Sequence, residues 1–456
     1  MSQYLKLVSA LIVILAVYWS IFRTGQKLEE LEEKWWGDSG AKSTENREIT
    51  KTRIDVPSEV LRDLQQRLEN TKPFHPSHTG VAQHYGITTT VLNSVLEHWR
   101  TKYNWTERQN YLNRYPQYFV QIRGLRIHFV HIKPQIQQGT KKILPLMLLH
   151  GWPSSFSEFY EVVPYLVTPQ KDRDYVFELV IPSLPGFAFS QSSRKPGLSS
   201  VYIAQIFKDL MEVLGYQRYY VHGGDWGSTI AQHMAHRFQD RVIGLHSTMC
   251  FINSPRAMFM FFIGKYLPSL IYDNEEVKLC NSIANSLSFI ISETGYFHLQ
   301  ATKPDTVGVA LRDSPMGLAA YMLEKFSTLT NAAYRDRDDG GLTEKFTWDR
   351  LLDNIMIYWV TQSMTSAMRI YAEAFTNRNL EVGSFNSMRI DIPTGCARFP
   401  YELLVSPRSI LKEKFQNLIH LTSFNTGGHF SALEEPKLLA NDIYAFVNKV
   451  QQENVN

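Results

Sequence analysis

The stretch YYVHGGDWGSTIAQHMAHRF, residues 219–238, holds an aspartate where a nucleophile is expected. It predicts a short strand, a glycine-rich turn and an amphipathic helix, and the turn has the G-x-S-x-G spacing of a nucleophile elbow with Asp225 in place of serine. Such an elbow presents its central side chain at the carboxyl edge of a parallel sheet, where open α/β sheets bind ligands. A helix-capping aspartate or a phosphate loop could use a similar turn, but an acidic side chain repels phosphate and no Lys-Ser/Thr pair follows. Asp225 is therefore a candidate nucleophile.

Two further residues follow in the order nucleophile, acid, histidine that α/β-hydrolases use. His429 in GGHF lies between the last predicted strand and the last predicted helix, so its imidazole can reach the elbow. Glu402 in RFPYELL is the best-placed acid, because Asp391 lies at the start of the preceding strand. A lone histidine is usually structural and Glu402 could be a surface carboxylate. Their placement favours catalytic roles.

The segment HGWP, residues 150–153, ends one buried strand and opens a helix, the place where these folds form an oxyanion hole. The backbone N–H groups of Trp152 and Trp226 are the expected donors, and removing one such donor typically costs about 2.7 to 4 kcal/mol. The candidate substrate contacts are Pro153, Phe187 and Phe430.

A carboxylate nucleophile narrows the substrate class, because Asp225 brings its own carbonyl and needs only a polarised sp³ carbon with a leaving group. It is already ionised near pH 7, so His429 is free to deprotonate the water that later cleaves the ester. The substrate is then an epoxide or an alkyl halide. An opening epoxide needs O–H donors and a departing halide is better held by N–H groups. The apolar sequence after residue 250 offers O–H donors, notably Tyr296 and Tyr371. It also offers the N–H donors Trp348 and Trp359, so the residues alone leave both substrate classes open.

Composition limits the other function classes. The chain has 456 residues, 44% of them hydrophobic, and a net charge of +3 with no basic stripe, so nucleic acid is not an expected partner. Three widely spaced cysteines suggest neither a disulfide framework nor a zinc pattern and favour a reducing, cytosol-facing body. His233 and His236 lie three apart on the elbow helix without a third ligand. No metal and no cofactor are expected.

An unbroken apolar run, residues 7–22, lies between Lys6 and Arg23. As a helix it reaches about 24 Å, and the flanking cations can snorkel to span a bilayer core of about 30 Å. A cleaved signal peptide is the alternative, but no clear small-x-small cleavage site follows. The excess of positive charge after the run predicts a single-pass anchor with a cytosolic body. A single sequon at Asn104 fits a lumenal body instead.

The rest of the chain alternates apolar strands and amphipathic helices from residue 143, which predicts an α/β fold with a mostly parallel central sheet. The alternation stops between about 250 and 389, where apolar helical sequence predicts a cap inserted into the core. The expected division is: 1–25 transmembrane anchor, 26–52 juxtamembrane linker, 53–140 N-terminal segment wrapping the core, 141–249 first part of the core, 250–389 helical cap and 390–456 second part of the core.

The sequence resembles the microsomal epoxide hydrolases, including the insect juvenile hormone epoxide hydrolases, over nearly its whole length. The matching motifs are WWG at residues 35–37, LNRYPQYFVQIRGLRIHF, LLHGWPSSFSEFY, SLPGF, GGDWGS, GYFHLQATKPDTVG, LEKFSTLTN, PYEL and GGHF. Ser154, where many relatives have glycine, and FHPSHTGVAQHYG depart from the family pattern, which leaves the pocket shape open.

The resemblance implies the α/β-hydrolase fold with an epoxide-hydrolase N-terminal segment, and residence in the endoplasmic reticulum membrane. It implies Asp225 as nucleophile, with Glu402 and His429 as the charge relay. Tyr296 and Tyr371 would donate to the epoxide oxygen of a small lipophilic substrate, a juvenile hormone-like terpenoid or a foreign arene or alkene oxide. The rival functions are a haloalkane dehalogenase and a non-enzymatic carrier of a lipophilic hormone. The sequence leaves the oligomeric state open.

Overall fold

A nine-stranded sheet forms the centre of the computed structural model, which describes residues 31–38, 45–134, 142–170, 173–252, 254–272, 276–277, 291–375 and 388–453. The strand order is β1-β2-β3-β5-β4-β6-β7-β8-β9. The bounds are β1 Thr50–Thr52, β2 Gln117–Ile122, β3 Leu125–Ile132, β4 Lys142–Leu149, β5 Tyr175–Pro182, β6 Tyr219–Gly223, β7 Val242–Ser247, β8 Thr394–Arg398 and β9 Leu418–Ser423. The pairs β1–β2, β2–β3 and β3–β5 are antiparallel and every other pair is parallel. The predicted fold class, α/β with a mostly parallel sheet, is confirmed.

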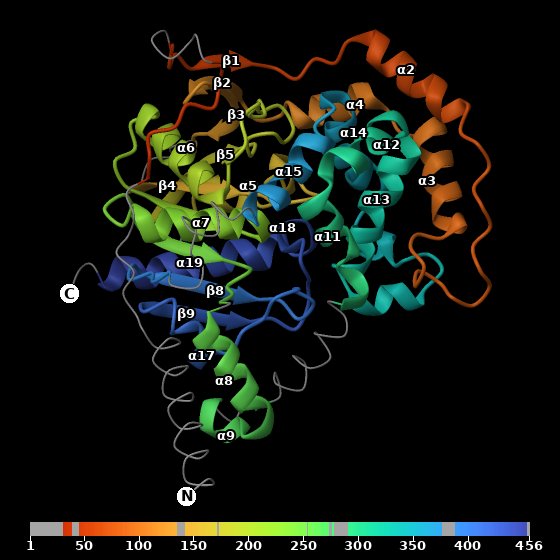
Figure 1. Cartoon of the computed structure of the whole chain (residues 1–456). Coiled ribbons are helices and arrows are strands. Elements are labelled where there is room, and N and C mark those ends of the chain that lie inside the picture. The colour runs from red at the N-terminus through yellow and green to blue at the C-terminus, as the bar shows by residue number, and fades with distance from the viewer. Residues whose placement is uncertain are drawn as a thin grey trace, which may run out of the picture.

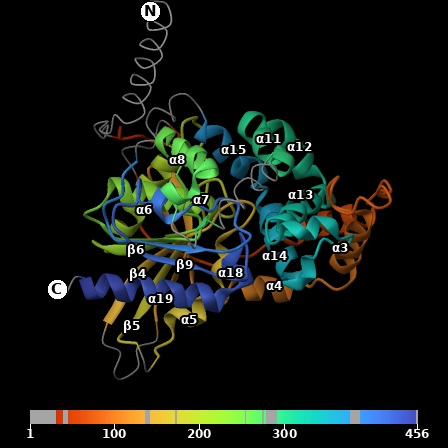
Figure 2. The ribbon, with the colours of Figure 1, turned by 90° about the horizontal axis from the view of Figure 1, so that it is seen from below.

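Helices cover both faces of this sheet (Figures 1 and 2). On one face α6 (Ser200–Val213) packs on α7 (Asp225–Arg237), and on the other α5 (Val163–Val167) packs on α19 (Pro436–Glu453). The single helix indicated after HGWP is instead the 3₁₀ turn η2 (Phe156–Phe159) followed by α5. Pro164 lies in the first turn of α5, where its missing N–H is tolerated, and it cannot continue a helix that began earlier.

Helices alone follow β7 before the sheet resumes at β8, within the residues that the structure describes there. They are α8 (Pro255–Tyr266), α9 (Pro268–Ile271), α11 (Gly295–Thr302), α12 (Pro304–Asp313), α13 (Pro315–Thr328), η3 (Ala332–Asp336), η4 (Leu342–Glu344), α14 (Trp348–Thr361) and α15 (Met364–Ala374). Four of them, α8, α9, α12 and α13, begin at a proline, which is tolerated at the first helical position. Two short helices, α17 (Arg408–Leu411) and α18 (Ser431–Glu434), complete the C-terminal part.

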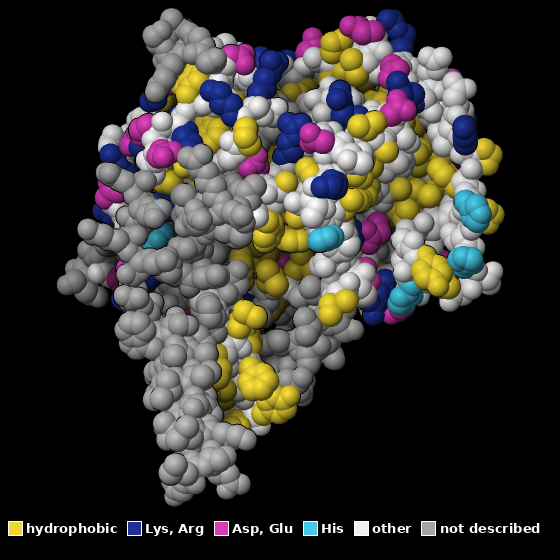
Figure 3. Space-filling view, viewed as in Figure 1, with side chains coloured by type: hydrophobic (Ala, Val, Ile, Leu, Met, Phe, Trp, Pro, Cys, Tyr) yellow, Lys and Arg dark blue, Asp and Glu magenta, His cyan; other side chains and the backbone are white. Residues whose placement is uncertain are grey.

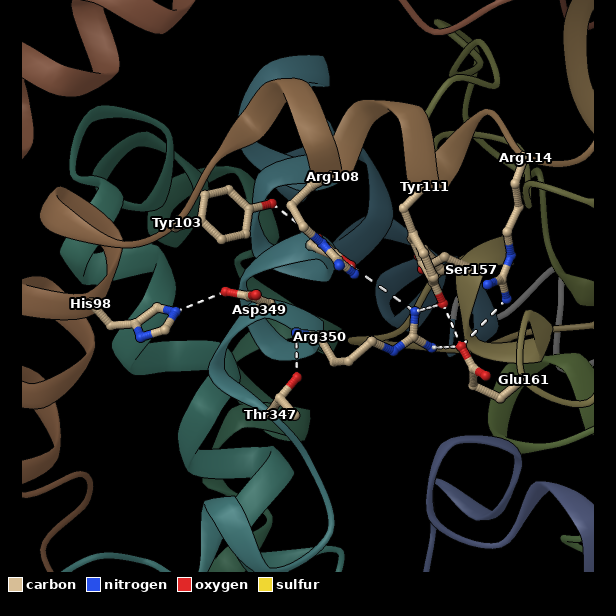
Figure 4. Close-up of polar contacts among 12 residues, drawn as sticks. His98, Tyr103, Arg108, Tyr111, Arg114, Ser157, Glu161, Thr347, Asp349 and Arg350 are labelled. Atoms are coloured by element: carbon tan, nitrogen blue, oxygen red, sulfur yellow. Dashed lines mark hydrogen bonds and ion pairs between the residues drawn. The ribbon is translucent and has the colours of Figure 1, made fainter.

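The N-terminal segment runs from β1 along the molecule to these helices through α2 (Ser58–Glu69), α3 (Thr89–Thr101) and α4 (Trp105–Leu112) (Figure 1). Figure 4 shows the junction, where side chains of α3 and α4 meet α14. Arg108 donates to both carboxylate oxygens of the buried Asp353, and His98 contacts Asp349 at 2.7 Å. Breaking a buried pair such as Arg108–Asp353 is strongly destabilising, so this contact ties the segment to α14.

Cys250 and Cys396 form a disulfide, which corrects the prediction drawn from the cysteine count. The two residues are 146 apart in sequence, but β7 and β8 are parallel neighbours, and Cys396 pairs in register with Ser247 at the end of β7. Long-range pairing of this kind leaves no local pattern. Because disulfides are typical of oxidising compartments, the cysteines give no support to a reducing environment.

The predicted membrane anchor, residues 1–25, lies outside the described residues. None of the helices in the described ranges is long and apolar enough to cross a membrane.

Candidate active site

Asp225 lies at the turn between β6 and α7, as the elbow spacing predicts. Its φ is +46°, a left-handed conformation that costs a non-glycine residue on the order of 1–3 kcal/mol. A Cβ at Gly227 would lie 2.0 Å from the carbonyl oxygen of Leu149, and one at Gly151 would lie 2.2 Å from Oδ1 of Asp225. These two positions must be glycine for strand, helix and the following loop to meet, so the backbone holds the carboxylate in a fixed, strained turn.

His429 lies between two carboxylates. Its Nδ1–H donates to Oε1 of Glu402 at 2.6 Å, and its Nε2 lies 3.4 Å from Oδ2 of Asp225. Burial alone would lower the pKa of His429, but the charges and hydrogen bonds of Glu402 and Asp225 outweigh it and raise the pKa well above its ordinary value. With Asp225 ionised the imidazole is therefore held as a cation.

A second glutamate, which the sequence reasoning missed, braces the histidine loop. Both carboxylate oxygens of Glu434 accept backbone N–H groups, from Gly428 at 2.7 Å and from Phe430 at 2.9 Å. On the other side, the N–H of His429 donates to the carbonyl of Leu329 at 3.1 Å. A glutamate in the first turn of a helix commonly accepts backbone N–H groups of the preceding loop. This position of Glu434 was the only sign of its role in the sequence.

The HGWP loop supplies a donor to the carboxylate. The N–H of Trp152 donates to Oδ1 of Asp225 at 2.8 Å. The loop is fixed from the cap by α14, where Asn354 donates to the carbonyl of Pro153 and Tyr358 donates to that of Ser154. The N–H of Trp226 lies in the first turn of α7, whose amides have no acceptor within the helix, so it is also free to point at developing charge.

The two tyrosines named from the sequence lie together over these tryptophans. Tyr296 stacks on Trp152 at 5.2 Å between ring centroids, and Tyr371 meets the edge of Trp226 at 4.9 Å. The two tyrosine rings lie 6.2 Å apart between centroids. Burial, reinforced by the negative charge of Asp225, raises the pKa of both hydroxyls well above the ordinary value, so both remain protonated donors. Two O–H groups therefore lie within the influence of the Asp225 charge.

The remaining sequence candidates lie in different places. Phe430 lines a cavity beside Asp225 and stacks on Phe326 at 4.2 Å. Phe187 is fully buried against His150 at 5.5 Å, and neither it nor Pro153 is among the described residues that line this cavity. Trp359 lies under the guanidinium of Arg67 on the N-terminal segment. The roles of Pro153 and Phe187 in substrate binding therefore remain predictions.

The two histidines of the elbow helix pack elsewhere. Burial lowers the pKa of His233 well below its ordinary value, and His236 contacts the backbone carbonyl of Arg389. Across the described ranges, no group of three or more His, Cys, Asp or Glu side chains could hold a metal ion.

The chain is similar to known proteins over most of its length. Residues 49–159 match the family model described as epoxide hydrolase N terminus, and residues 145–396 match that of the alpha/beta hydrolase fold. It is 44% identical to juvenile hormone epoxide hydrolase 2 of Ctenocephalides felis over 96% of this chain and 94% of that protein. It is 38% identical to epoxide hydrolase 1 of Sus scrofa over 99% of this chain and 100% of that protein. The crystal structure of juvenile hormone epoxide hydrolase from the silkworm Bombyx mori has a TM-score of 0.91 and 41% identity, covering 93% of this chain and 100% of that one.

Proposed function

The chain belongs to the family of epoxide hydrolases, and on that premise we propose that it converts lipophilic epoxides and water to vicinal diols through an ester on Asp225. The observation that carries the mechanism is the position of this carboxylate. One oxygen accepts the N–H of Trp152, the other faces His429, and two protonated tyrosines lie over the adjacent tryptophans.

In the first step Oδ2 of Asp225 attacks a carbon of the epoxide ring. The new C–O bond forms as the ring C–O bond breaks, and the electron pair of that bond goes to the epoxide oxygen. Tyr296 and Tyr371 donate hydrogen bonds to this oxygen and supply its proton. Oδ1 keeps its hydrogen bond from Trp152 and becomes the carbonyl oxygen of the ester.

Esterification then prepares His429 for the second step. Once Asp225 is an ester, its negative charge no longer raises the pKa of His429, and burial lowers that pKa with only Glu402 opposing it. The imidazolium can then give up its Nε2 proton, which reprotonates the phenolate left by the first step, and the neutral imidazole takes a proton from water. The water oxygen bonds to Cγ of Asp225, and the oxyanion on Oδ1 is stabilised by the N–H groups of Trp152 and Trp226. Collapse breaks the bond between Cγ and the alkyl oxygen, and His429 returns the proton to the departing diol. The proton left on the new carboxyl of Asp225 then passes to Nε2 of His429, which restores the carboxylate and the imidazolium.

The proposed substrate class is supported by the relatives, several of which are named juvenile hormone epoxide hydrolases. We propose a lipophilic epoxide, with terpenoid hormones of this kind preferred over foreign arene and alkene oxides. Purified protein should form diol from juvenile hormone and from styrene oxide, and juvenile hormone should have the higher kcat/KM in competition. Halide released from haloalkanes without diol formation would favour a dehalogenase. A radiolabelled epoxide recovered unchanged would favour a binding protein.

Replacing either tyrosine by phenylalanine should slow the first step. Removing one of two donors to the epoxide oxygen should lower the alkylation rate about 10²-fold, by analogy with the loss of one oxyanion donor, and removing both should lower it further. Single-turnover fluorescence resolves the step. Tyr321→Phe is the matched control, because Tyr321 also packs on Trp152 but its hydroxyl pairs with Gln300. A Tyr296→Phe, Tyr371→Phe double variant that alkylates at the normal rate would remove both from the mechanism.

We also propose that residues 1–25 anchor the protein in the endoplasmic reticulum membrane as a single pass. An exposed apolar face on α8 and α9 supports contact with a lipid surface (Figure 3). Its side chains are Met258, Phe259, Phe262, Tyr266, Leu267 and Leu270. The flanking charges favour a cytosolic body and the disulfide favours an oxidising compartment.

Glycosylation of Asn104 reports the orientation of the body. Asn104 is exposed at the start of α4, where its side chain accepts the N–H of Thr106. For the cytosolic body that we propose, protein expressed in microsomes should show no gel shift with a glycosidase, and Asn104→Gln should migrate as wild type. A glycosidase-sensitive band that this substitution removes would place the body in the lumen.

We propose the division of the chain given above, with 53–140 as the wrapping segment and 250–389 as the lid. It is supported by the helices between β7 and β8 and by the ion pairs that join α3 and α4 to α14.

A further inference from the structure

A polar cavity beside Asp225 contains a carboxyl group that the two steps above do not use. The cavity has a volume of about 20 Å³, room for about one water, and is lined by Asp225, His429, Glu158, Ser154 and His222, among others. Neither Tyr296 nor Tyr371 is among the described residues that line it. The cavity therefore opens on the ester carbon and the base, and is separate from the tyrosines.

Trp152 marks the boundary between the two regions. It lines the cavity and also stacks on Tyr296. The epoxide oxygen must meet the tyrosines in the first step, whereas the water of the second step must meet His429. A small polar chamber that holds His429 and excludes the tyrosines has the composition needed to store that water.

Glu158 is held in this chamber from both sides. It lies on η2, and Ser154, whose polar side chain acts on the pKa of this carboxyl, lines the same cavity. Three residues later Glu161 accepts the hydroxyl of Tyr111 at 2.6 Å and the guanidinium of Arg114 at 3.3 Å, which fixes the outer side of the turn (Figure 4). The carboxyl of Glu158 is thus placed on a rigid element rather than on a free loop.

The protonation of Glu158 suits a group that binds water without competing as a base. Desolvation raises the pKa of Glu158 to about 8, opposed by the hydrogen bond from Ser154 and the charge of His429 and reinforced by the charge of Asp225. At neutral pH the group is mainly the uncharged acid, which has a carbonyl oxygen that accepts and a hydroxyl that donates.

We propose that Glu158 positions the hydrolytic water by accepting a hydrogen bond from one of its O–H groups while His429 takes the proton of the other. This inference rests on the proposed function, because it requires the ester on Asp225. The water oxygen bonds to Cγ, one proton goes to Nε2 of His429, and the second stays on the oxygen. Glu158 gains and loses no proton, so it is a positioning residue.

His222, the other titratable group in the cavity lining apart from the reacting pair, is a poorer candidate. Burial lowers its pKa well below the ordinary value, with His246 adding to the effect, so it is neutral. Its Nδ1 already contacts Nδ1 of His246 at 2.8 Å, and His246 continues to Asp442 at 2.9 Å. This network fixes the side chain of His222 in the wall of the cavity.

The test separates formation of the ester from its breakdown. With enzyme in excess over styrene oxide, Glu158→Leu should form the ester within twofold of the wild-type rate and hydrolyse it about 10- to 100-fold more slowly, as expected for losing one hydrogen bond in the transition state. Glu158→Gln should restore most of the hydrolysis rate, because its amide oxygen can accept the same hydrogen bond. Glu161→Gln, the matched control outside the cavity, should behave as wild type.

Three results would overturn the inference: normal ester breakdown in Glu158→Leu, equal slowing of both steps, or no recovery with Glu158→Gln. Should the leucine variant fail to fold, Ser154→Ala removes the neighbouring polar group of the cavity wall and should slow breakdown severalfold, and an unchanged rate would count against the role. His429→Gln in the same assay keeps the two proposals apart. If it and the wild type form no ester, the proposed function fails; if it accumulates ester and Glu158→Leu does not, only the role of Glu158 fails.

Discussion

Asp225→Ala should abolish diol formation, with kcat/KM falling at least about 10⁴-fold, because the carboxylate that forms the ester is removed. The remaining donors and His429 would still be present, but His429 would have no ester to hydrolyse. The fold should survive, since the side chain is half-buried and accepts a backbone hydrogen bond from the N–H of Trp152. Diol measured by chromatography and the midpoint of thermal unfolding check the two parts of this expectation.

An isotope experiment distinguishes the ester from direct attack by water. In a single turnover of wild-type protein in heavy-oxygen water, the label should enter the carboxyl group of Asp225, because the water oxygen bonds to Cγ. The diol should then carry one oxygen from the epoxide and one from the aspartate, neither of them labelled. Label found only in the diol would mean that water opens the epoxide directly, and the ester mechanism would have to be abandoned.

His429→Gln should block hydrolysis of the ester rather than its formation, so turnover stops after the first step. The ester should form and persist, since glutamine cannot take a proton from water. General base catalysis typically contributes about 10² to 10⁴-fold, so hydrolysis should slow by at least that factor. Intact-mass analysis should show one added substrate mass on nearly every molecule.

The double variant Asp225→Ala, His429→Gln is the control and should show no added mass. Glu402→Gln should lie between wild type and His429→Gln, because the imidazole keeps its position but loses the charge that raises its pKa. If folded His429→Gln binds substrate and never gains mass, the histidine acts before the ester forms and the two-step assignment is wrong.

Local patterns were sufficient for the parts of the site that a single strand, turn or loop defines. The elbow at Asp225, the GGHF loop at His429 and the position of Glu402 after a strand are all short-range features, and the structure brings these three side chains together. The parallel strands were likewise evident from continuous apolar runs, because such strands are buried on both faces.

Features that depend on the packing of distant segments could not be predicted from local patterns. Which tyrosines reach the elbow depends on how α11 and α15 pack, so Tyr296 and Tyr371 required the family resemblance. Glu158 was missed because its segment was read as a continuous helix, whereas Pro164 breaks it and η2 turns the carboxyl into the cavity.

The bond between Cys250 and Cys396 closes the chain between them into a covalent ring, with Cys396 on β8 and Cys250 three residues after the end of β7. A protease that cuts the chain inside this ring leaves both parts of the intervening helical segment attached to the core. Separation of the fragments then requires a reductant as well as the cut, so a clipped molecule can keep its tyrosines over the elbow.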